Sequence, residues 1–214
     1  MQPMIGIFGG TFDPIHYGHL RTALELTQQI GLTRVHFVPC ASPPHRAAPM
    51  IDGKLRLRMV QAAIQGEPGF VADDRELTRP GLSYTVDTLA SFRAEFPTAP
   101  LCFLLGMDAF LNLPYWHRWR ELLDLAHIVV AQRPGWESPT GGMLGELWLE
   151  RRTIQAGELK ASRAGRIHMQ PVTQLEISST DLRASLRARV DPKFLMPDSV
   201  RQIILETECY AETA

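Results

Sequence analysis

The sequence predicts an α/β fold: a single doubly wound parallel sheet with helices on both faces. Short apolar runs alternate with longer segments of helical periodicity, which is the pattern of a parallel sheet wrapped by helices. The composition, 45% hydrophobic and 21% charged, is that of an ordinary globular protein. The length of 214 residues suits one sizeable domain, which we expect to span residues 1–214.

Six apolar runs are predicted to be strands because each is too short for a helix of normal length. They are Met4–Phe8, Val35–Pro39, Phe70–Ala72, Leu101–Gly106, Ile128–Ala131 and Ile167–Met169. Helical spacing of apolar residues predicts helices between them. These are Gly18–Ile30, Lys54–Ile64, Thr85–Phe96, Arg118–Leu125 and Ser179–Arg187. The Gly- and Pro-rich stretch Gly135–Gly142 is expected to be a surface loop.

Charge and cysteine usage exclude several classes of protein. A formal net charge of -1 gives no general field that attracts nucleic acid or an anionic membrane. The three cysteines are far apart and never form a C-x-x-C pair, so neither a disulfide framework nor a cysteine zinc site is indicated. No apolar run reaches the roughly 18 residues that span a bilayer. We therefore expect a cytoplasmic protein that binds anions only locally.

The stretch GGTFDPIHYGHL, residues 9–20, has the composition of a phosphate-binding loop. It follows the first predicted strand and leads into a helix, where ligands of such sheets usually bind. Gly9 and Gly10 would let the backbone approach a ligand closely, and the helix N-terminus favours an anion. The chain contains neither G-x-x-x-x-G-K-[ST] nor G-x-G-x-x-G, so His16 and His19 replace the lysine of a Walker A loop.

Two other interpretations of this loop stay open. Two histidines three residues apart can share one helix face and ligate zinc, but no local H-E-x-x-H supplies a further ligand, so Asp13 or a distant residue would be needed. A turn that binds nothing would leave the glycines and both imidazoles unexplained.

GGTFDPIHYGHL resembles the H-x-G-H signature of the nucleotidylyltransferase superfamily, and ISSTDLR at 177–183 resembles its second signature, I-S-S-T-x-[IV]-R. Leu182 is the one departure, a volume-conserving change. FVPCASPPHR, SYTVDTL, FLLGMDAF, WHRW and QRPG lie between the two signatures. Over nearly its full length the chain resembles the bacterial nicotinate-nucleotide adenylyltransferases, which implies a Rossmann-like nucleotidylyltransferase fold.

The resemblance implies transfer of AMP from ATP to nicotinate mononucleotide, giving deamido-NAD and pyrophosphate in NAD biosynthesis. Direct in-line attack needs no covalent intermediate, so the protein mainly aligns two anions and neutralises charge. Mg²⁺ is expected on ATP, held by phosphate and water oxygens, with no protein metal ligand. No nucleic-acid or membrane partner is expected, and homo-oligomerisation stays open.

The site residues that the resemblance implies fall into three groups. His16, His19 and Arg183 would act on the phosphates as catalytic residues. ATP would also contact Gly9, Gly10, Thr11, Phe12, Gly106, Asp108, Ile177, Ser178 and Ser179. Nicotinate mononucleotide would contact His45, Arg46, Thr85, Trp116 and Arg133.

Several of these assignments have an ordinary structural alternative. His45, Arg46 and Arg133 are also typical surface residues of loops, and Asp108 also suits the start of a helix. Trp116 and Trp119 are the candidates to stack on the nicotinate ring, although large aromatics are more often core residues. The resemblance favours Trp116, and assigns Thr85 a main-chain contact to the nicotinate carboxylate.

Arg183 is the most specific of the predictions. Ser179 is expected to be the N-cap of a helix, which would place Arg183 where the helix dipole disfavours a cation. Either a bound phosphate or an ion pair with Asp181 or Glu176 would explain it. We therefore expect Arg183 to contribute little to the stability of the unliganded protein.

Related functions fit the sequence less well. Pantetheine-phosphate adenylyltransferases have threonine where His16 stands, and cytidylyltransferases differ in the second signature. A non-catalytic nucleotide sensor with the same fold is a different class of function, but it would not need both phosphate signatures and a nicotinate pocket.

Overall fold

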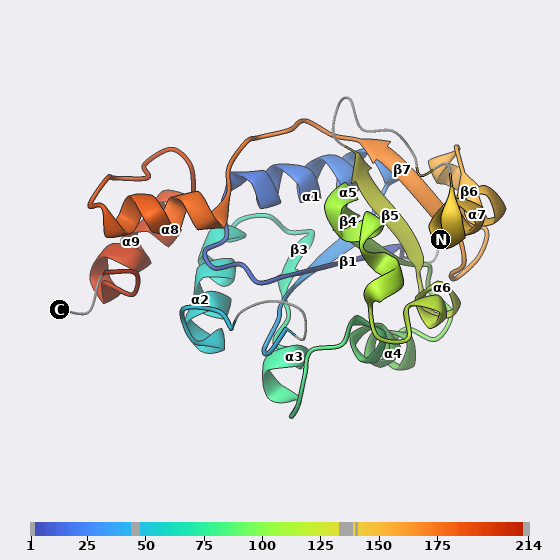
Figure 1. Ribbon diagram of the computed structural model, residues 1–214, viewed down its shortest axis with the longest axis horizontal. Coiled ribbons are helices and arrows are strands. Elements are labelled where there is room, and N and C mark those ends of the chain that lie inside the picture. Colours follow the sequence, from blue (N-terminus) through green and yellow to red (C-terminus); the bar gives the residue numbers. More distant parts are fainter. Residues whose placement is uncertain (1–2, 44–47, 133–138, 140, 212–214) are drawn as a thin grey trace.

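The computed structural model describes residues 3–43, 48–132, 139 and 141–211, which contain one seven-stranded sheet (Figure 1). All of its strand pairs are parallel, in the order β3-β2-β1-β4-β5-β7-β6. The strands are β1 Ile5–Gly10, β2 Arg34–Pro39, β3 Phe70–Ala72, β4 Leu101–Gly106, β5 His127–Gln132, β6 Arg152–Thr153 and β7 Ile167–Pro171. The predicted α/β class and all six predicted strands are confirmed. The edge strand β6 was not predicted because two residues carry no alternation.

Four of the five predicted helices are confirmed, and the structure adds four further helices. The helices are α1 Tyr17–Ile30, α2 Gly53–Ala63, α3 Arg75–Thr78, α4 Thr85–Glu95, α5 Met107–Leu111, α6 Leu122–Leu125, α7 Gly142–Arg151, α8 Ser179–Arg187 and α9 Asp198–Thr207. Three short 3₁₀ turns are η1 Leu113–Tyr115, η2 Trp119–Glu121 and η3 Ala156–Lys160. The helix expected over 118–125 is wrong as a single element, because Arg118 is left-handed (φ 52°) and η2 precedes α6. Helices α3, α5, α7 and α9 were not predicted.

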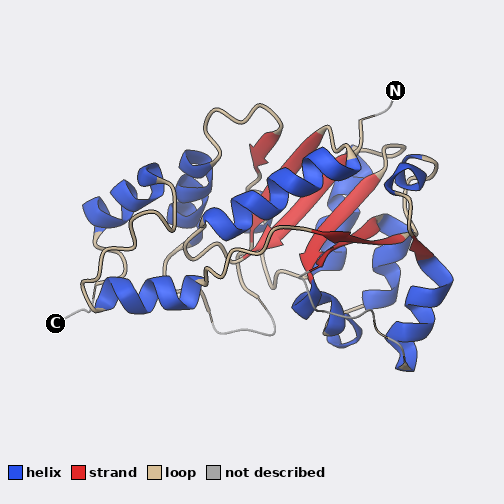
Figure 2. Ribbon diagram, turned by 90° about the horizontal axis from the view of Figure 1, so that it is seen from above, coloured by secondary structure: helices blue, strands red, loops and turns tan. Residues whose placement is uncertain are grey.

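Two apolar clusters cover the two faces of the sheet. Helices lie on both sides of the strands (Figure 2). Successive residues of β1 alternate between the two clusters: Phe8 belongs to one cluster and Ile7 to the other. Helices α1, α2 and α9 pack on the face of Phe8, whereas α4, α5, α6 and α7 pack on the face of Ile7. This is the doubly wound arrangement that the sequence predicts.

The strand order sets the position of a ligand site. From β1 the chain proceeds outward to β2 and β3, and from β4 it proceeds in the opposite direction to β5 and β7. The order therefore reverses between the neighbours β1 and β4, and ligands of such sheets bind outside the carboxyl ends at this point. Gly10 ends β1 and Gly106 ends β4.

At the opposite, amino-terminal end of the strands, Arg93 of α4 fastens several chain segments. Its guanidinium donates only to backbone carbonyl oxygens, at 2.7–3.4 Å: those of Phe96, Pro97, Ala99, Leu125 and Arg163. Leu125 precedes β5 and Ala99 precedes β4, so one side chain holds the starts of neighbouring strands together.

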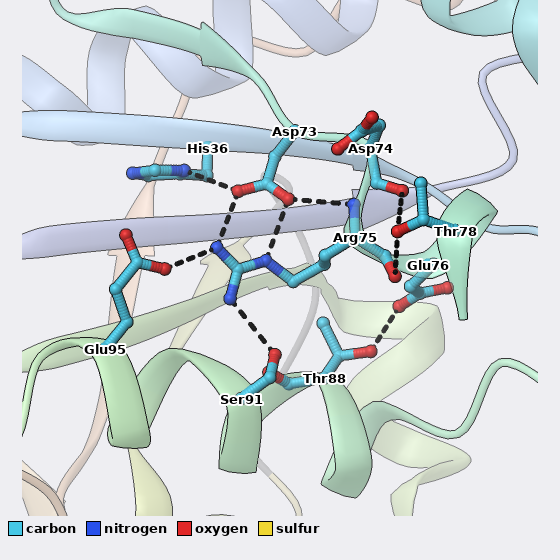
Figure 3. A network of polar contacts seen from close by, with 9 residues as sticks. All are labelled: His36, Asp73, Asp74, Arg75, Glu76, Thr78, Thr88, Ser91 and Glu95. Carbon is cyan, nitrogen blue, oxygen red and sulfur yellow. Dashed lines mark hydrogen bonds and ion pairs between the residues drawn. The ribbon is translucent and has the colours of Figure 1, made fainter.

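A polar network joins the β2–β3 edge of the sheet to α4 (Figure 3). The Asp73 carboxylate accepts from His36 Nδ1 at 2.9 Å and from the guanidinium of Arg75 at 2.8 Å. Arg75 donates in turn to Ser91 and Glu95 of α4. Burial alone would raise the pKa of Asp73, but the hydrogen bonds from His36 and Arg75 outweigh it and hold that pKa below its ordinary value.

Candidate active site

The loop after β1 folds back tightly on itself. Phe12 adopts a left-handed conformation (φ 48°), and its ring lies against Gly10, where a Cβ would come within 2.9 Å of it. Gly10 is therefore required by the packing of Phe12. Gly9 has more room, since the nearest atom to a Cβ there is 3.8 Å away on Phe103. Of the two glycines, only Gly9 still fits the prediction that the missing side chain lets a ligand approach the backbone closely.

His16 and His19 lie together at the start of α1. Their rings are stacked, with centroids 3.8 Å apart and an angle of 30° between the planes. The backbone N–H of His16, the residue before the helix, donates to Nδ1 of His19 at 3.3 Å. A Cβ on Gly18 would lie 3.0 Å from two atoms of the His16 ring, so glycine makes room for this ring.

Burial keeps both imidazoles neutral in the unliganded protein. It lowers the pKa of His16 from 6.5 to about 4. Burial also lowers the pKa of His19 well below its ordinary value, and the adjacent His16 adds to this. Nδ1 of His16 is buried and has no hydrogen-bond partner among the described residues. Such an atom is a free hydrogen-bonding position beside a helix N-terminus.

The second signature follows β7, which lies next to the edge strand β6, and contacts the loop after β1. After β7 the chain crosses over α1 to α8 (Figure 1), and Thr173 N–H donates to Glu25 of α1 at 2.6 Å. Ser178 is the N-cap of α8, so the prediction of Ser179 was wrong by one residue. Instead, the Ser179 hydroxyl donates to the carbonyl oxygen of Pro14 at 3.0 Å. This contact binds the two signatures together.

Arg183 is the fifth residue of α8 and contacts the loop directly. Its Nη1 donates to the carbonyl oxygen of Asp13 at 2.7 Å, and Nη2 donates to Thr180 Oγ1 at 3.3 Å. Neither expected ion pair, with Asp181 or Glu176, is found within the described ranges. The expectation that Arg183 contributes little to the stability of the unliganded protein did not include this hydrogen bond, which ties α8 to the carbonyl oxygen of Asp13.

Asp13 is buried, and both of its carboxylate oxygens accept hydrogen bonds. Its Oδ2 accepts from the backbone N–H of Met50 at 2.8 Å, and its Oδ1 accepts from the hydroxyl of Tyr210 at 2.6 Å. Burial and the adjacent Asp13 raise the pKa of Tyr210, so its hydroxyl stays protonated as a donor. Sequence reasoning missed Tyr210, which lies in no motif.

Arg56 of α2 was also missed, although it is among the largest fully buried side chains. Its Nη1 and Nη2 donate to the carbonyl oxygens of Thr11 and Cys40, each at 2.7 Å, and its Nε donates to that of Ile51 at 3.2 Å. Thr11 follows β1 and Cys40 follows β2. The guanidinium thus lies between the loops after two neighbouring strands.

Of the residues predicted to bind the nicotinate nucleotide, Thr85 and Trp116 belong to the described part of the chain. The Ser83 hydroxyl oxygen, before α4, accepts from Ala41 and Ser42 in the loop after β2. Thr85 is the first residue of α4, and the ring of the preceding Tyr84 lies 4.3 Å from that of His117. His45, Arg46 and Arg133 lie outside the described residues.

The structure separates the two tryptophan candidates. Trp119 is buried in the core, whereas Trp116 is half-buried and packs edge-on against Phe103 with centroids 6.1 Å apart. Trp116 is therefore the one with a ring surface left to offer.

At the end of β4, Gly106 is the N-cap of α5 and Asp108 is its second residue. Asp108 is exposed. It does not initiate the helix as a cap, but a carboxylate in the first turn complements the helix dipole.

The zinc interpretation of the loop finds no further ligand in the part of the chain that the structure describes. Within it, no three His, Cys, Asp or Glu side chains gather as a metal site. No helix there is long and apolar enough to cross a membrane.

Comparisons with known proteins show the family of this chain. A family model described as cytidylyltransferase-like matches residues 7–185. Relatives from Aeromonas hydrophila and Methylococcus capsulatus are each 48% identical over 210 residues. These cover 98% of this chain and 98% and 100% of the relatives, and both proteins are named "Probable nicotinate-nucleotide adenylyltransferase".

Solved structures share the fold. Plasmodium falciparum nicotinic acid mononucleotide adenylyltransferase, complexed with NaAD, matches with a TM-score of 0.73 at 19% identity over 97% of each chain. The same enzyme complexed with APC matches with a TM-score of 0.71 at 18% identity. From the family model and the two close relatives, the chain belongs to the cytidylyltransferase-like family and, within it, to the bacterial nicotinate-nucleotide adenylyltransferases.

Proposed function

We propose that the protein transfers AMP from ATP to nicotinate mononucleotide, giving deamido-NAD and pyrophosphate in NAD biosynthesis. The observation that carries the proposal is the stacked pair His16 and His19, with a buried unpartnered Nδ1, at the start of α1 beside the ends of β1 and β4. The names of the close relatives state the same activity for those proteins.

On the ATP side, His16 and His19 donate to phosphate oxygens together with the free N–H groups at the start of α1. An approaching triphosphate favours the protonated imidazoles, which burial alone disfavours. Arg183 supplies a second cation from α8 while one of its nitrogens stays on Asp13. Gly106 and Asp108, the predicted ribose contacts, lie at the end of β4. The other predicted ATP contacts lie at the end of β1 and in the loop after it, and at the start of α8.

On the nicotinate side, Trp116 stacks on the ring and the backbone N–H of Thr85 meets the carboxylate. A charge-assisted bond to a carboxylate is stronger than one to a neutral amide, so this contact favours nicotinate over nicotinamide. His45, Arg46 and Arg133 complete the predicted set of contacts to this substrate.

Catalysis then consists mainly of alignment. The phosphate of nicotinate mononucleotide attacks the α-phosphorus of ATP in line, and pyrophosphate leaves. Holding both reactants in this geometry lowers the barrier by roughly 7–11 kcal/mol. Mg²⁺ bound with ATP would be held by phosphate and water oxygens and would neutralise phosphate charge, while His16, His19 and the backbone N–H groups donate to the remaining phosphate oxygens.

The test is release of pyrophosphate from ATP, measured with nicotinate mononucleotide and, in parallel, with nicotinamide mononucleotide. We expect release with both substrates present, a preference for nicotinate, and no release from ATP alone. Binding of both nucleotides without release would identify a sensor. Release with cytidine triphosphate in place of ATP would also contradict the proposal.

A further inference from the structure

Arg56 is a buried cation without a counter-ion. Its residue is 1% exposed, and no carboxylate of the described residues pairs with it. Its three hydrogen bonds all go to backbone carbonyl oxygens. Burying a charge is costly, and an apolar side chain of similar volume is often at least as stable at such a position. Packing alone therefore does not explain why an arginine is here.

The positions of its partners give the explanation. Thr11 belongs to the loop that carries the proposed ATP contacts, and Cys40 begins the loop that leads to His45 and Arg46. The two loops also meet directly, because Cys40 N–H donates to the carbonyl oxygen of Gly10 at 2.9 Å. The two ends of one planar guanidinium thus hold one loop each, at 2.7 Å.

The charge adds to this geometry. Both substrates are phosphate anions, and a buried cation is screened far less by water and salt than an exposed one. The fixed fork of arginine spans two carbonyl groups, which the single ammonium of lysine does not do. Arg56 is thus both rigid and positive beneath the two loops.

We propose that Arg56 is a positioning residue that sets the two substrate loops relative to each other, so that its loss impairs the use of ATP and nicotinate mononucleotide together. This inference rests on the proposed function, since that function assigns one substrate to each loop. It differs from a role in the fold alone, which would change stability without changing the kinetics of folded protein.

The test compares Arg56→Lys with Arg93→Lys. Both replacements keep the charge and remove a guanidinium that donates to backbone carbonyl oxygens, but Arg93 lies at the other end of the strands. Melting temperatures are measured without ligand, and kcat and both KM values are then measured well below the lowest of them. Trp116→Ala serves as a control in which only the KM for nicotinate mononucleotide is expected to rise.

For Arg56→Lys we expect both KM values to rise, or kcat to fall, by about tenfold to a hundredfold, the cost of displacing a reacting group slightly. For Arg93→Lys we expect a lowered melting temperature and kinetic constants close to those of the wild type. The proposal is overturned if folded Arg56→Lys has wild-type constants, if only one substrate is affected, or if Arg93→Lys changes the constants equally.

Hydrogen exchange gives a readout that does not depend on turnover. The amide of Cys40 reports the contact between the two loops, and we expect its protection to fall in Arg56→Lys while that of Ile5, which donates to Pro100 at the other end of the sheet, is kept. Equal loss at both amides would contradict the proposal.

If Arg56→Lys does not fold, Arg56→Met is judged by the same criteria, and failure of both to fold would assign Arg56 to the fold. If the wild type releases no pyrophosphate, the proposed function fails. The inference is then tested by titration of ATP and nicotinate mononucleotide, and it fails if Arg56→Lys binds both as tightly as the wild type.

Discussion

At each end of the parallel strands, one arginine donates hydrogen bonds to backbone carbonyl oxygens, but the surroundings of the two arginines differ. Arg93 at the amino-terminal end and Arg56 at the carboxyl-terminal end both donate only to backbone carbonyl oxygens. At the amino-terminal end the nearby polar groups are paired: His127 makes a bond through Nε2 to Ser162 O and accepts through Nδ1 from Arg166 N–H. At the carboxyl-terminal end, Nδ1 of His16 has no partner among the described residues.

This difference distinguishes polar groups that serve the fold from polar groups that are free to bind a ligand. Where the buried polar groups satisfy one another, the segment needs nothing else. Where a firmly held loop at the ligand end of the sheet has a free buried donor or acceptor, as His16 does, we expect a ligand to be the missing partner. Nε2 of His36 is also unpartnered among the described residues, but it lies within β2 against the rings of Phe92 and Phe96. Four predictions test this comparison, in order of decreasing effect.

The largest effect is expected at the carboxyl-terminal end of the strands, where His16 lies. We expect His16→Ala or His19→Ala to lower kcat by about 10²–10³-fold, because contacts to developing phosphate charge strengthen in the transition state. The KM for nicotinate mononucleotide should change less, and the melting temperature of the apo protein should change little. Stoichiometric zinc in the purified wild type, lost from His16→Ala, would show that the loop is a metal site.

At the amino-terminal end of the strands, we expect replacement of Arg93 to change stability alone. Arg93→Met leaves several carbonyl oxygens without a donor, which we expect to cost about 3 kcal/mol and to lower the melting temperature by about 6–12 °C. Kinetic constants below the transition should match those of the wild type. A changed KM for either substrate would remove the distinction between the two ends.

Arg183 is expected both to support the fold and to bind ATP, because only one of its nitrogens donates to the carbonyl oxygen of Asp13. We expect Arg183→Ala to weaken ATP binding by about tenfold or more and to cost about 1 kcal/mol of unfolding free energy, the usual contribution of one hydrogen bond. ATP titration and thermal melting of the same protein measure the two. A destabilised variant with unchanged ATP affinity would place Arg183 in the fold only.

The smallest effect is a pH dependence. Below pH 6.5 His16 takes up a proton in the unfolded chain, but in the native protein it does so only near pH 4. Its stabilising contribution is therefore complete above pH 6.5 and is lost as the pH falls toward 4. Between pH 7 and 5 we expect the wild type to lose about 1–2 kcal/mol more than His16→Asn. Urea unfolding at both pH values measures this, and equal losses in the two proteins would contradict it.

Local patterns in the sequence predicted the sheet and the loop after β1, because strand length, helical periodicity and glycine-rich turns are short-range properties. They also predicted that the two signatures bind one ligand. The error between Ser178 and Ser179 arose because either serine can cap a helix, and the contact of Ser179 with Pro14 decides between them. That contact joins residues far apart in the sequence.

The missed residues have the same cause. Arg56 and Arg58 look alike in the sequence, yet Arg56 is buried beneath two loops and Arg58 is exposed beside Glu206. Only the packing of α2 against the ends of β1 and β2 distinguishes them. Tyr210 has no local signal, because its partner Asp13 precedes it by 197 residues.

The bond between Tyr210 and Asp13 also has a consequence for biosynthesis on the ribosome. Translation at about 5–20 residues per second separates the two residues by roughly 10–40 s. By the end of this interval the nascent chain contains both histidines and every strand of the sheet, but the carboxylate of Asp13 still lacks the phenol hydroxyl of Tyr210 as a donor. The loop after β1, among the first parts of the protein to be synthesised, is therefore among the last to receive all of its hydrogen bonds.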